Sequence, residues 1–80
     1  MYIVYILKAQ LYNRYYIGHT NNLSNRLARH NKGYVKSTKV YRPWILIYTE
    51  EFKTKPEAYK RELQIKSYKS GEAFKKLIKK

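Results

Sequence analysis

The chain has 80 residues, a formal net charge of +13 and no cysteine. This length allows one small domain, and the lack of cysteine excludes disulfides, thiolate metal sites and a cysteine nucleophile. Hydrophobic residues make up 44% of the chain and ten residues are tyrosine, so the composition of disordered proteins is absent. We therefore expect a single folded domain over residues 1–80, suited to a reducing cytoplasm.

The positive charge is concentrated where no acid balances it. All five acidic residues are glutamates after position 49, whereas the first 49 residues carry eight lysines and arginines. An unbalanced positive field of this kind attracts phosphate groups at ordinary salt. We predict a nucleic-acid partner, with DNA favoured, over two alternatives: a membrane surface, and a basic surface that serves only solubility.

The N-terminal half predicts a hairpin. The apolar run at residues 1–7 is too short for a signal peptide or a membrane span, and residues 2–8 have the β-branched and aromatic composition of a strand. Residues 14–18 predict a second strand close enough to form a hairpin with the first. A loop centred on Gln10 and Leu11 sets Tyr5 opposite Tyr16, on the same face of the sheet.

A helix with two polar residues on its inner face follows the hairpin. Asn21 or Asn22 can cap it, and Gly33 predicts its end. At 100° per residue, Arg26 and His30 lie on the same stripe as the leucines of this segment. A basic loop over residues 34–42 follows, and Pro43 then opens a third strand at residues 44–50.

The C-terminal part predicts two further helices. Thr54 and Glu57 form a capping box for a helix that extends to about residue 68. Its predicted inward arc contains Glu62, with Lys66 as a possible ion-pair partner, and four apolar or aromatic residues: Ala58, Tyr59, Leu63 and Ile65. Ser70 and Gly71 predict a break, after which Phe74, Leu77 and Ile78 form the apolar face of a last short helix.

Five polar or aromatic positions carry a family resemblance. The first strand contains Val4-Tyr5-Ile6 and the second Tyr16-Ile17-Gly18, the next helix bears Arg26 and His30, and the following helix bears Glu62. Together they resemble the GIY-YIG nuclease domain over essentially all 80 residues. That domain occurs in homing endonucleases, in the incision subunit of nucleotide excision repair and in small stand-alone bacterial proteins, which are the most similar group.

The resemblance implies an α+β fold, a three-stranded antiparallel sheet flanked by three helices in the order β-β-α-β-α-α. It also implies a metal-dependent endonuclease that hydrolyses phosphodiester bonds in DNA with low sequence specificity and uses one Mg²⁺ or Mn²⁺ ion. DNA repair is a process in which such domains act. No small-molecule cofactor and no membrane partner are expected, and the oligomeric state is undetermined.

The resemblance assigns roles to the five positions. Tyr16 would be the general base for the attacking water, Tyr5 its neighbour in one hydrogen-bonded cluster, and His30 a group that orients or relays a proton. Arg26 would neutralise the phosphate oxygens, for which a guanidinium offers two parallel donors. Glu62 would be the single protein ligand of the metal, because Mg²⁺ prefers oxygen ligands and keeps several waters.

Other cations are predicted to contact nucleic acid. His19 lies where some relatives carry a lysine near the phosphate. The remaining predicted contacts come from the first helix and the basic loop after it: Arg29, Lys36, Lys39 and Arg42. For Lys36 and Lys39, a flexible solvated loop is the alternative interpretation.

Structural interpretations of the same residues stay open beside these roles. Tyr5 and Tyr16 could be a cross-strand aromatic pair, Arg26 a snorkelling side chain and His30 a packing histidine. Glu62 could serve only as the partner of Lys66 or Arg61.

The sequence departs from the family pattern at two points. The first motif lacks its initial glycine, and no asparagine follows Glu62, although several active members have one. A basic binding module with weak or no hydrolysis is therefore the alternative function.

Overall fold

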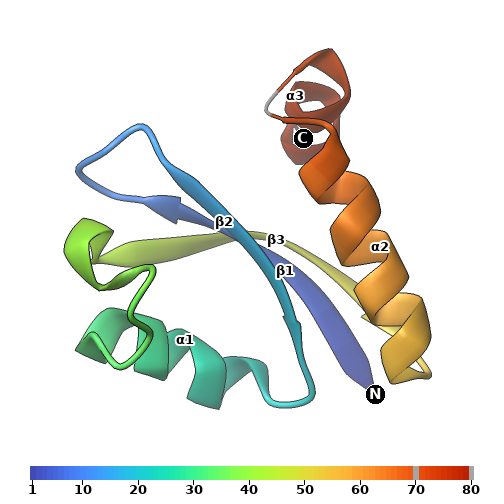
Figure 1. The fold of residues 1–80 in the computed structure, drawn as a ribbon, viewed down its shortest axis with the longest axis horizontal. Helices are drawn as coiled ribbons and strands as arrows, with labels where there is room; N and C mark the ends of the chain where they lie inside the picture. Colours follow the sequence, from blue (N-terminus) through green and yellow to red (C-terminus); the bar gives the residue numbers. More distant parts are fainter. Residues whose placement is uncertain (70, 80) are drawn as a thin grey trace.

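The computed structural model describes residues 1–69 and 71–79 and contains three strands and three α-helices (Figure 1). In chain order the elements are β1 (Tyr2–Ala9), β2 (Tyr15–Thr20), α1 (Leu23–Lys32), the 3₁₀ helix η1 (Lys39–Tyr41), β3 (Trp44–Phe52), α2 (Lys55–Ser67) and α3 (Glu72–Ile78). This confirms the predicted α+β fold and element order. Ser70, part of the predicted break, lies outside the described residues, and Gly71 is the N-cap of α3.

The sheet is antiparallel with the order β2-β1-β3, so β1 is its central strand. The run Val4–Leu7 is fully buried, because β1 has a strand on each side and helices over both faces. The long apolar run at the N-terminus is therefore a central strand, as predicted. β2 and β3 form the two edges, and β3 runs two residues further than predicted, to Phe52.

The predicted hairpin register is wrong by two residues. Tyr5 pairs with Gly18, and Leu7 pairs with Tyr16. The turn is wider than a two-residue Gln-Leu turn, since the Ala9 backbone N–H donates to the Arg14 carbonyl across residues 10–13. A shift of two residues preserves the alternation of a strand, so Tyr5 and Tyr16 still share a face.

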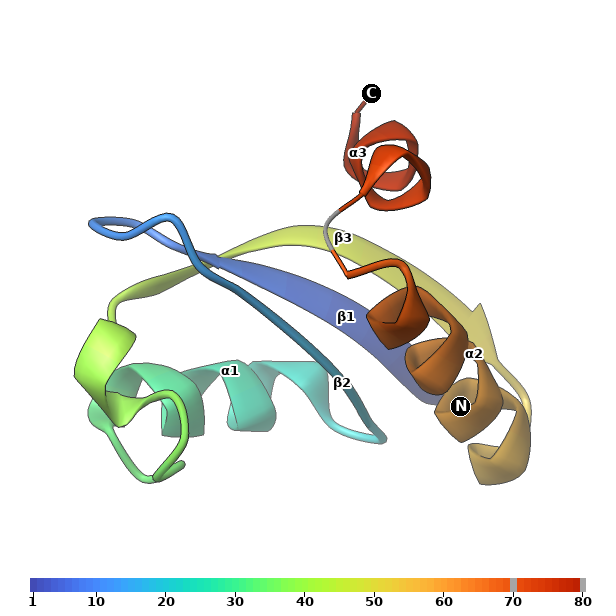
Figure 2. The ribbon, with the colours of Figure 1, turned by 45° about the horizontal axis from the view of Figure 1, so that its top comes forward.

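Alternate residues of β1 supply two cores on opposite faces of the sheet. Val4 and Ile6 pack with Ala58, Ile65 and Phe74, under α2 and α3. On the other face, toward α1 and η1, the core consists of Tyr5, Leu7, Ala9 and Trp44, with Leu23 and Leu27 packed against it. Figure 2 shows α1 on one side of the sheet and α2 with α3 on the other. The sheet thus separates the helix that carries Arg26 and His30 from the helix that carries Glu62.

The predicted caps define the ends of the helices. Asn22 accepts from the Asn25 backbone N–H at the start of α1, and Gly33 ends it with φ 82°, in the left-handed region that glycine adopts readily. Thr54 and Glu57 form the predicted capping box of α2. No helix in the described part of the chain has the length and apolarity needed to cross a bilayer.

The predicted inward arc of α2 is too wide. Ala58, Glu62 and Ile65 are buried, but Tyr59 is 50% exposed and Leu63 47% exposed. The two exposed residues lie at about 100° and 140° from Ala58 on the helical wheel, at the margin of the buried stripe. A single helix that packs on a sheet buries a narrower stripe of side chains than the helical wheel predicted. Residues at the margin of this stripe therefore remain exposed to solvent.

Candidate active site

Gly18 makes room for two tyrosine rings on the α1 face of the sheet. A Cβ atom at Gly18 would lie 2.7 Å from the Tyr5 hydroxyl oxygen and 3.1 Å from a ring carbon of Tyr16. The two ring centroids are 6.2 Å apart. The glycine of the Tyr16-Ile17-Gly18 motif is therefore required by packing, because any larger residue would displace Tyr5 from its position.

A buried hydrogen-bond chain fixes the Tyr5 hydroxyl. The His30 Nε2 atom lies 3.0 Å from this hydroxyl, and His30 Nδ1 lies 2.8 Å from the Thr38 hydroxyl, which donates to the Val35 carbonyl. Since the Thr38 proton goes to Val35, Nδ1–H donates to Thr38 and Nε2 accepts from Tyr5. Tyr5 is 1% exposed and His30 0%, so the chain is closed to water.

Burial determines the protonation states of Tyr5 and His30 in this hydrogen-bond chain. Burial and the positive charges of Arg26 and Arg29 together lower the pKa of His30 to about 4. Burial also raises the pKa of Tyr5 well above its ordinary value; Tyr16 and Glu62 add to this shift, and Arg26 opposes it. At neutral pH, Tyr5 is therefore a neutral donor and His30 a neutral acceptor.

A hollow opens at the C-terminal end of β2. Its volume is about 190 Å³, and its lining includes His19 and Thr20 from β2, Asn21, and Arg26 from α1. Tyr2 and Lys55 complete the lining from β1 and the start of α2. Arg26, His19 and Lys55 make the hollow basic, so it suits a phosphate group.

Glu62 reaches the same edge of the sheet from α2. The His19 Nδ1 atom lies 2.6 Å from Oε1 of Glu62, and Lys66 Nζ donates to Oε2 at 2.6 Å. Glu62 is 7% exposed, and the ring of Tyr59 packs against His19 at 5.7 Å. The predicted Lys66 pair is confirmed, whereas Arg61 pairs with Glu50 instead.

The five predicted site residues come from opposite faces of the sheet and converge around edge strand β2. Tyr5, Tyr16 and His30 form one ring cluster, with Tyr16 and His30 centroids 4.8 Å apart. Arg26 and Glu62 are both close enough to shift the pKa of Tyr5. His19 joins the two sides, because it lines the hollow with Arg26 and pairs with Glu62.

Glu62 fits a single-ligand Mg²⁺ site. The described residues contain no cluster of three or more histidine, cysteine or acidic side chains that could hold a metal. A carboxylate offers about four acceptor positions, so Glu62 keeps acceptor capacity beside its contacts to His19 and Lys66. Mg²⁺ commonly takes one or two carboxylates and completes its shell with waters and substrate phosphates.

The other predicted nucleic-acid contacts lie at the far end of α1. Arg29, Lys36, Lys39 and Arg42 are exposed, and they belong to the C-terminal half of α1, to η1 and to the residues around η1. The hollow is lined instead by Asn21 and Arg26, near the start of α1. Arg29 lies over the Tyr34 ring at 5.8 Å, and Arg42 donates to the Lys39 carbonyl. Only His19 of the predicted contacts lines the hollow itself.

Sequence reasoning missed Thr38 and, in the lining of the hollow, Tyr2, Thr20 and Lys55. Thr38 is 1% exposed and holds His30, but in the sequence it is one threonine within a basic loop. Tyr2 and Lys55 line the hollow. Nothing in the local sequence at the start of β1 or of α2 marks these residues as part of a site, because only tertiary packing brings the two ends together.

The sequence matches a known family of catalytic domains. The sequence model of the GIY-YIG catalytic domain matches residues 1–75, and the chain belongs to this family. Among its relatives, UPF0213 protein SH2523 of Staphylococcus haemolyticus is 42% identical over 73 residues, which cover 90% of this chain and 88% of that one. A UPF0213 protein of Staphylococcus aureus is 43% identical over 68 residues, covering 84% and 82%.

A solved structure is similar as well. The solution NMR structure of UPF0213 protein BH0048 from Bacillus halodurans has a TM-score of 0.50 and 31% sequence identity. The similarity covers 82% of this chain and 70% of that one. The chain is therefore similar to small UPF0213 proteins in both sequence and fold.

Proposed function

We propose that this protein is an endonuclease that hydrolyses phosphodiester bonds in DNA with low sequence specificity, and that it uses one Mg²⁺ or Mn²⁺ ion. The observation that carries the proposal is a basic hollow at the end of β2, lined by Arg26 and by His19, whose Nδ1 atom lies 2.6 Å from a Glu62 carboxylate oxygen. Membership of the GIY-YIG catalytic domain family supports it. The absence of cysteine favours a cytoplasmic setting, and DNA repair is the process that we propose for it.

Tyr16 is the general base in this proposal. The hydroxyl of Tyr5 is committed to His30, and its raised pKa disfavours the phenolate. Tyr16 is half-buried at the same cluster, so it is the tyrosine that solvent and substrate can reach. Tyr5 then supports the cluster, and His30 is a positioning residue that holds the Tyr5 ring.

Arg26 and Glu62 act on the phosphate side. Arg26 lines the hollow and donates to the non-bridging oxygens, where negative charge builds up in the transition state. Glu62 would hold the divalent ion, which supplies Lewis-acid stabilisation of the phosphate when bound. His19 orients the Glu62 carboxylate through its 2.6 Å contact and contacts nucleic acid from the wall of the hollow.

The test is a cleavage assay on linear, nicked and branched DNA with Mg²⁺ or Mn²⁺, against an EDTA control. We expect cleavage by the wild type, and its loss by a factor of about 100 or more in Tyr16→Phe and Glu62→Ala. DNA binding should persist in both variants. Equal cleavage by the wild type and both variants would identify a contaminant and overturn the proposal.

A nucleic-acid-binding module with weak or no hydrolysis is the second candidate. The observation in its favour is that both Glu62 oxygens already accept from His19 and Lys66. A cation at Lys66 competes with a metal ion for the same carboxylate. Binding without cleavage on every substrate of the panel would favour this candidate.

A further inference from the structure

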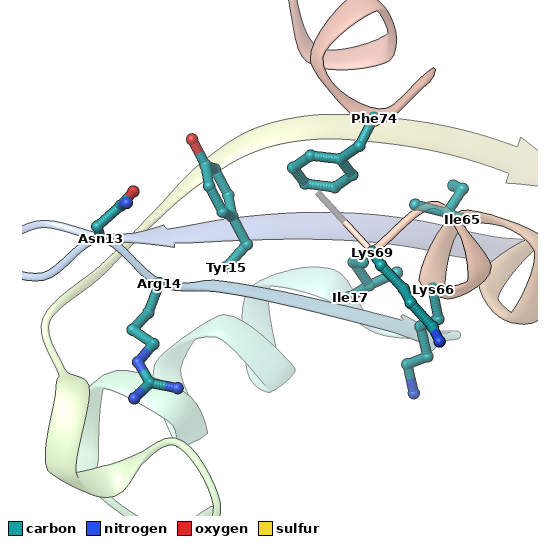
Figure 3. Close-up of a pocket in the computed structure, with 8 residues that line it drawn as sticks. All are labelled: Asn13, Arg14, Tyr15, Ile17, Ile65, Lys66, Lys69 and Phe74. Carbon is teal, nitrogen blue, oxygen red and sulfur yellow. The ribbon is translucent and has the colours of Figure 1, made fainter. Parts of the chain in front are cut away.

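A second basic pocket lies on the α2 and α3 side of edge strand β2. Its volume is about 550 Å³, within the roughly 300–1,000 Å³ typical of ligand sites. Figure 3 shows its walls: Tyr15 and Ile17 from β2, Arg14 just before β2, Lys66 from α2, Lys69 just after α2, and Phe74 from α3. We name these six residues the β2-edge pocket. None of the site residues discussed above lines it except Lys66.

The β2-edge pocket combines positive charge with an aromatic surface. Lys66 and Lys69 supply the positive charge, and no carboxylate of the described residues lines the pocket. The Arg14 guanidinium lies over the Tyr41 ring at 4.6 Å, on the other face of the sheet. The Tyr15 ring meets Phe74 edge to face at 5.0 Å, and Lys8 Nζ lies 5.9 Å from the same ring centroid. Phe74 is buried and holds the Tyr15 ring in place, which leaves half-buried Tyr15 as the aromatic surface available to a ligand.

The geometry points to a subsite for an unpaired strand of nucleic acid, which rests on the proposed nuclease function and specifies its substrate class. An unpaired nucleotide presents a phosphate and an open base face together, and proteins bind such strands with cationic grooves and aromatic side chains. A duplex keeps its base faces stacked inside the helix, so it cannot present an open base face to Tyr15. The combination of Tyr15 with Lys66 and Lys69 therefore matches a single strand better than a duplex.

The pocket and the candidate active site follow one another along β2. Tyr15, Ile17 and His19 lie on the same face of β2, because side chains alternate along a strand. Four residues of strand span about 13 Å, which is about four stacked nucleotides at ~3.4 Å each. Lys66 belongs to both places, since it lines the pocket and donates to Glu62. A strand in the pocket would thus lead to the hollow lined by His19 and Arg26.

Lys69 has a backbone conformation that lysine rarely adopts. Its φ is 49°, in the left-handed region that favours glycine. Lys69→Gly therefore removes the charge and relaxes the backbone in one change. The variant separates an effect on binding from an effect on folding, because we expect its affinity for the strand to fall while its stability rises.

The experiment measures fluorescence anisotropy with a labelled ten-nucleotide oligothymidylate and a labelled hairpin duplex, in EDTA so that no cleavage occurs. We expect Lys69→Gly to raise the thermal midpoint and to weaken oligothymidylate binding about fivefold, with less than a twofold effect on the duplex. The control is Lys60→Gln, which removes one charge from the other flank of α2, beside Phe52 and Gln64. It should change both affinities by less than twofold.

Chemical-shift mapping of the wild type with the same oligothymidylate gives a second readout. We expect shifts at Tyr15, Ile17 and Lys69. Equal effects of Lys69→Gly and Lys60→Gln, equal weakening of strand and duplex, or no shifts at these residues would each overturn the subsite. The cleavage assay with Mg²⁺ or Mn²⁺ distinguishes the two proposals. If the wild type cleaves DNA although one of these outcomes is observed, only the subsite proposal is wrong. If it neither binds nor cleaves DNA, the proposed function is wrong too.

Discussion

The packing of Tyr5 over Gly18 is the tightest residue-scale constraint in the candidate site. Gly18→Ala would bring a methyl group to 2.7 Å from the Tyr5 hydroxyl oxygen. We predict a loss of about 1–3 kcal/mol in the free energy of unfolding, the usual cost of overpacking a core. Urea denaturation measures it, and cleavage should fall as well because the ring cluster is displaced.

A double-mutant cycle provides the control for this prediction. Tyr5→Leu removes the Tyr5 hydroxyl oxygen and Cζ, the two closest of the three atoms that a Cβ at position 18 would meet. The cost of Gly18→Ala should therefore fall by at least half in the Tyr5→Leu background. An unchanged cost in both backgrounds would show that the strain arises elsewhere.

His30 predicts a specific dependence of stability on pH. Its pKa is lowered to about 4 in the folded protein, against an ordinary value of 6.5. Below pH 6.5 the unfolded chain gains a proton that the folded chain resists, so stability falls as the pH falls. We expect His30 to contribute a loss of about 2 kcal/mol between pH 7.5 and pH 5, measured by urea denaturation.

The measurement has a direct control. His30→Gln removes the titrating group, so its stability should depend less on pH over the same range. An NMR titration of the His30 imidazole in the wild type should give a pKa near 4. A midpoint near 6.5 would contradict the buried neutral histidine and the hydrogen-bond chain built on it.

At the scale of the elements, one side chain joins α1 to β3. The Asn31 amide accepts from the Trp44 backbone N–H at 2.6 Å and donates to the Trp44 carbonyl at 3.2 Å. The indole N–H of Trp44 donates to the Thr38 carbonyl. These contacts hold the end of α1, and with it the adjacent His30, in place against the sheet.

Asn31→Asp tests this connection. A carboxylate keeps the acceptor but loses the donor, and it opposes the Trp44 carbonyl. We predict a loss of about 1–2 kcal/mol in the free energy of unfolding. Asn25→Asp, which adds the same charge to an exposed position in the first turn of α1, should change stability by less than about 0.5 kcal/mol. Equal effects of the two variants would refute the connection.

At the scale of the whole molecule, the net charge of +13 predicts strong salt dependence of DNA binding. Lys36→Gln with Lys39→Gln removes two of the predicted contacts in the basic segment after α1. The slope of log affinity against log salt should fall by about 1.8 on duplex DNA, at ~0.9 per phosphate contact. Anisotropy titrations in EDTA over a range of NaCl concentrations measure this slope.

A charge-matched pair distinguishes contact from general attraction. Lys53→Gln with Lys60→Gln removes the same charge from exposed positions at the end of β3 and on α2. Its slope should remain close to that of the wild type. If both pairs lower the slope equally, the segment around η1 makes no specific contact with DNA.

The sequence alone predicts the element order, the end of α1 at Gly33, the capping box of α2 and the shared face of Tyr5 and Tyr16. These depend on local periodicity and on capping chemistry within a few residues, as with Thr54 and Glu57. The predicted hairpin register was wrong because nothing in the sequence around Gln10 and Leu11 distinguishes the four-residue turn at residues 10–13 from a two-residue turn. Tyr5 and Tyr16 kept their shared face only because the error was an even number of residues.

The long-range pairs among the polar groups follow from the tertiary structure. His19 and Glu62 are 43 residues apart in sequence and lie on different elements, and Thr38 reaches His30 from a loop. Such contacts depend on where α1 and α2 lie against opposite faces of the sheet. No local pattern encodes this placement, since it results from the packing of both cores around β1.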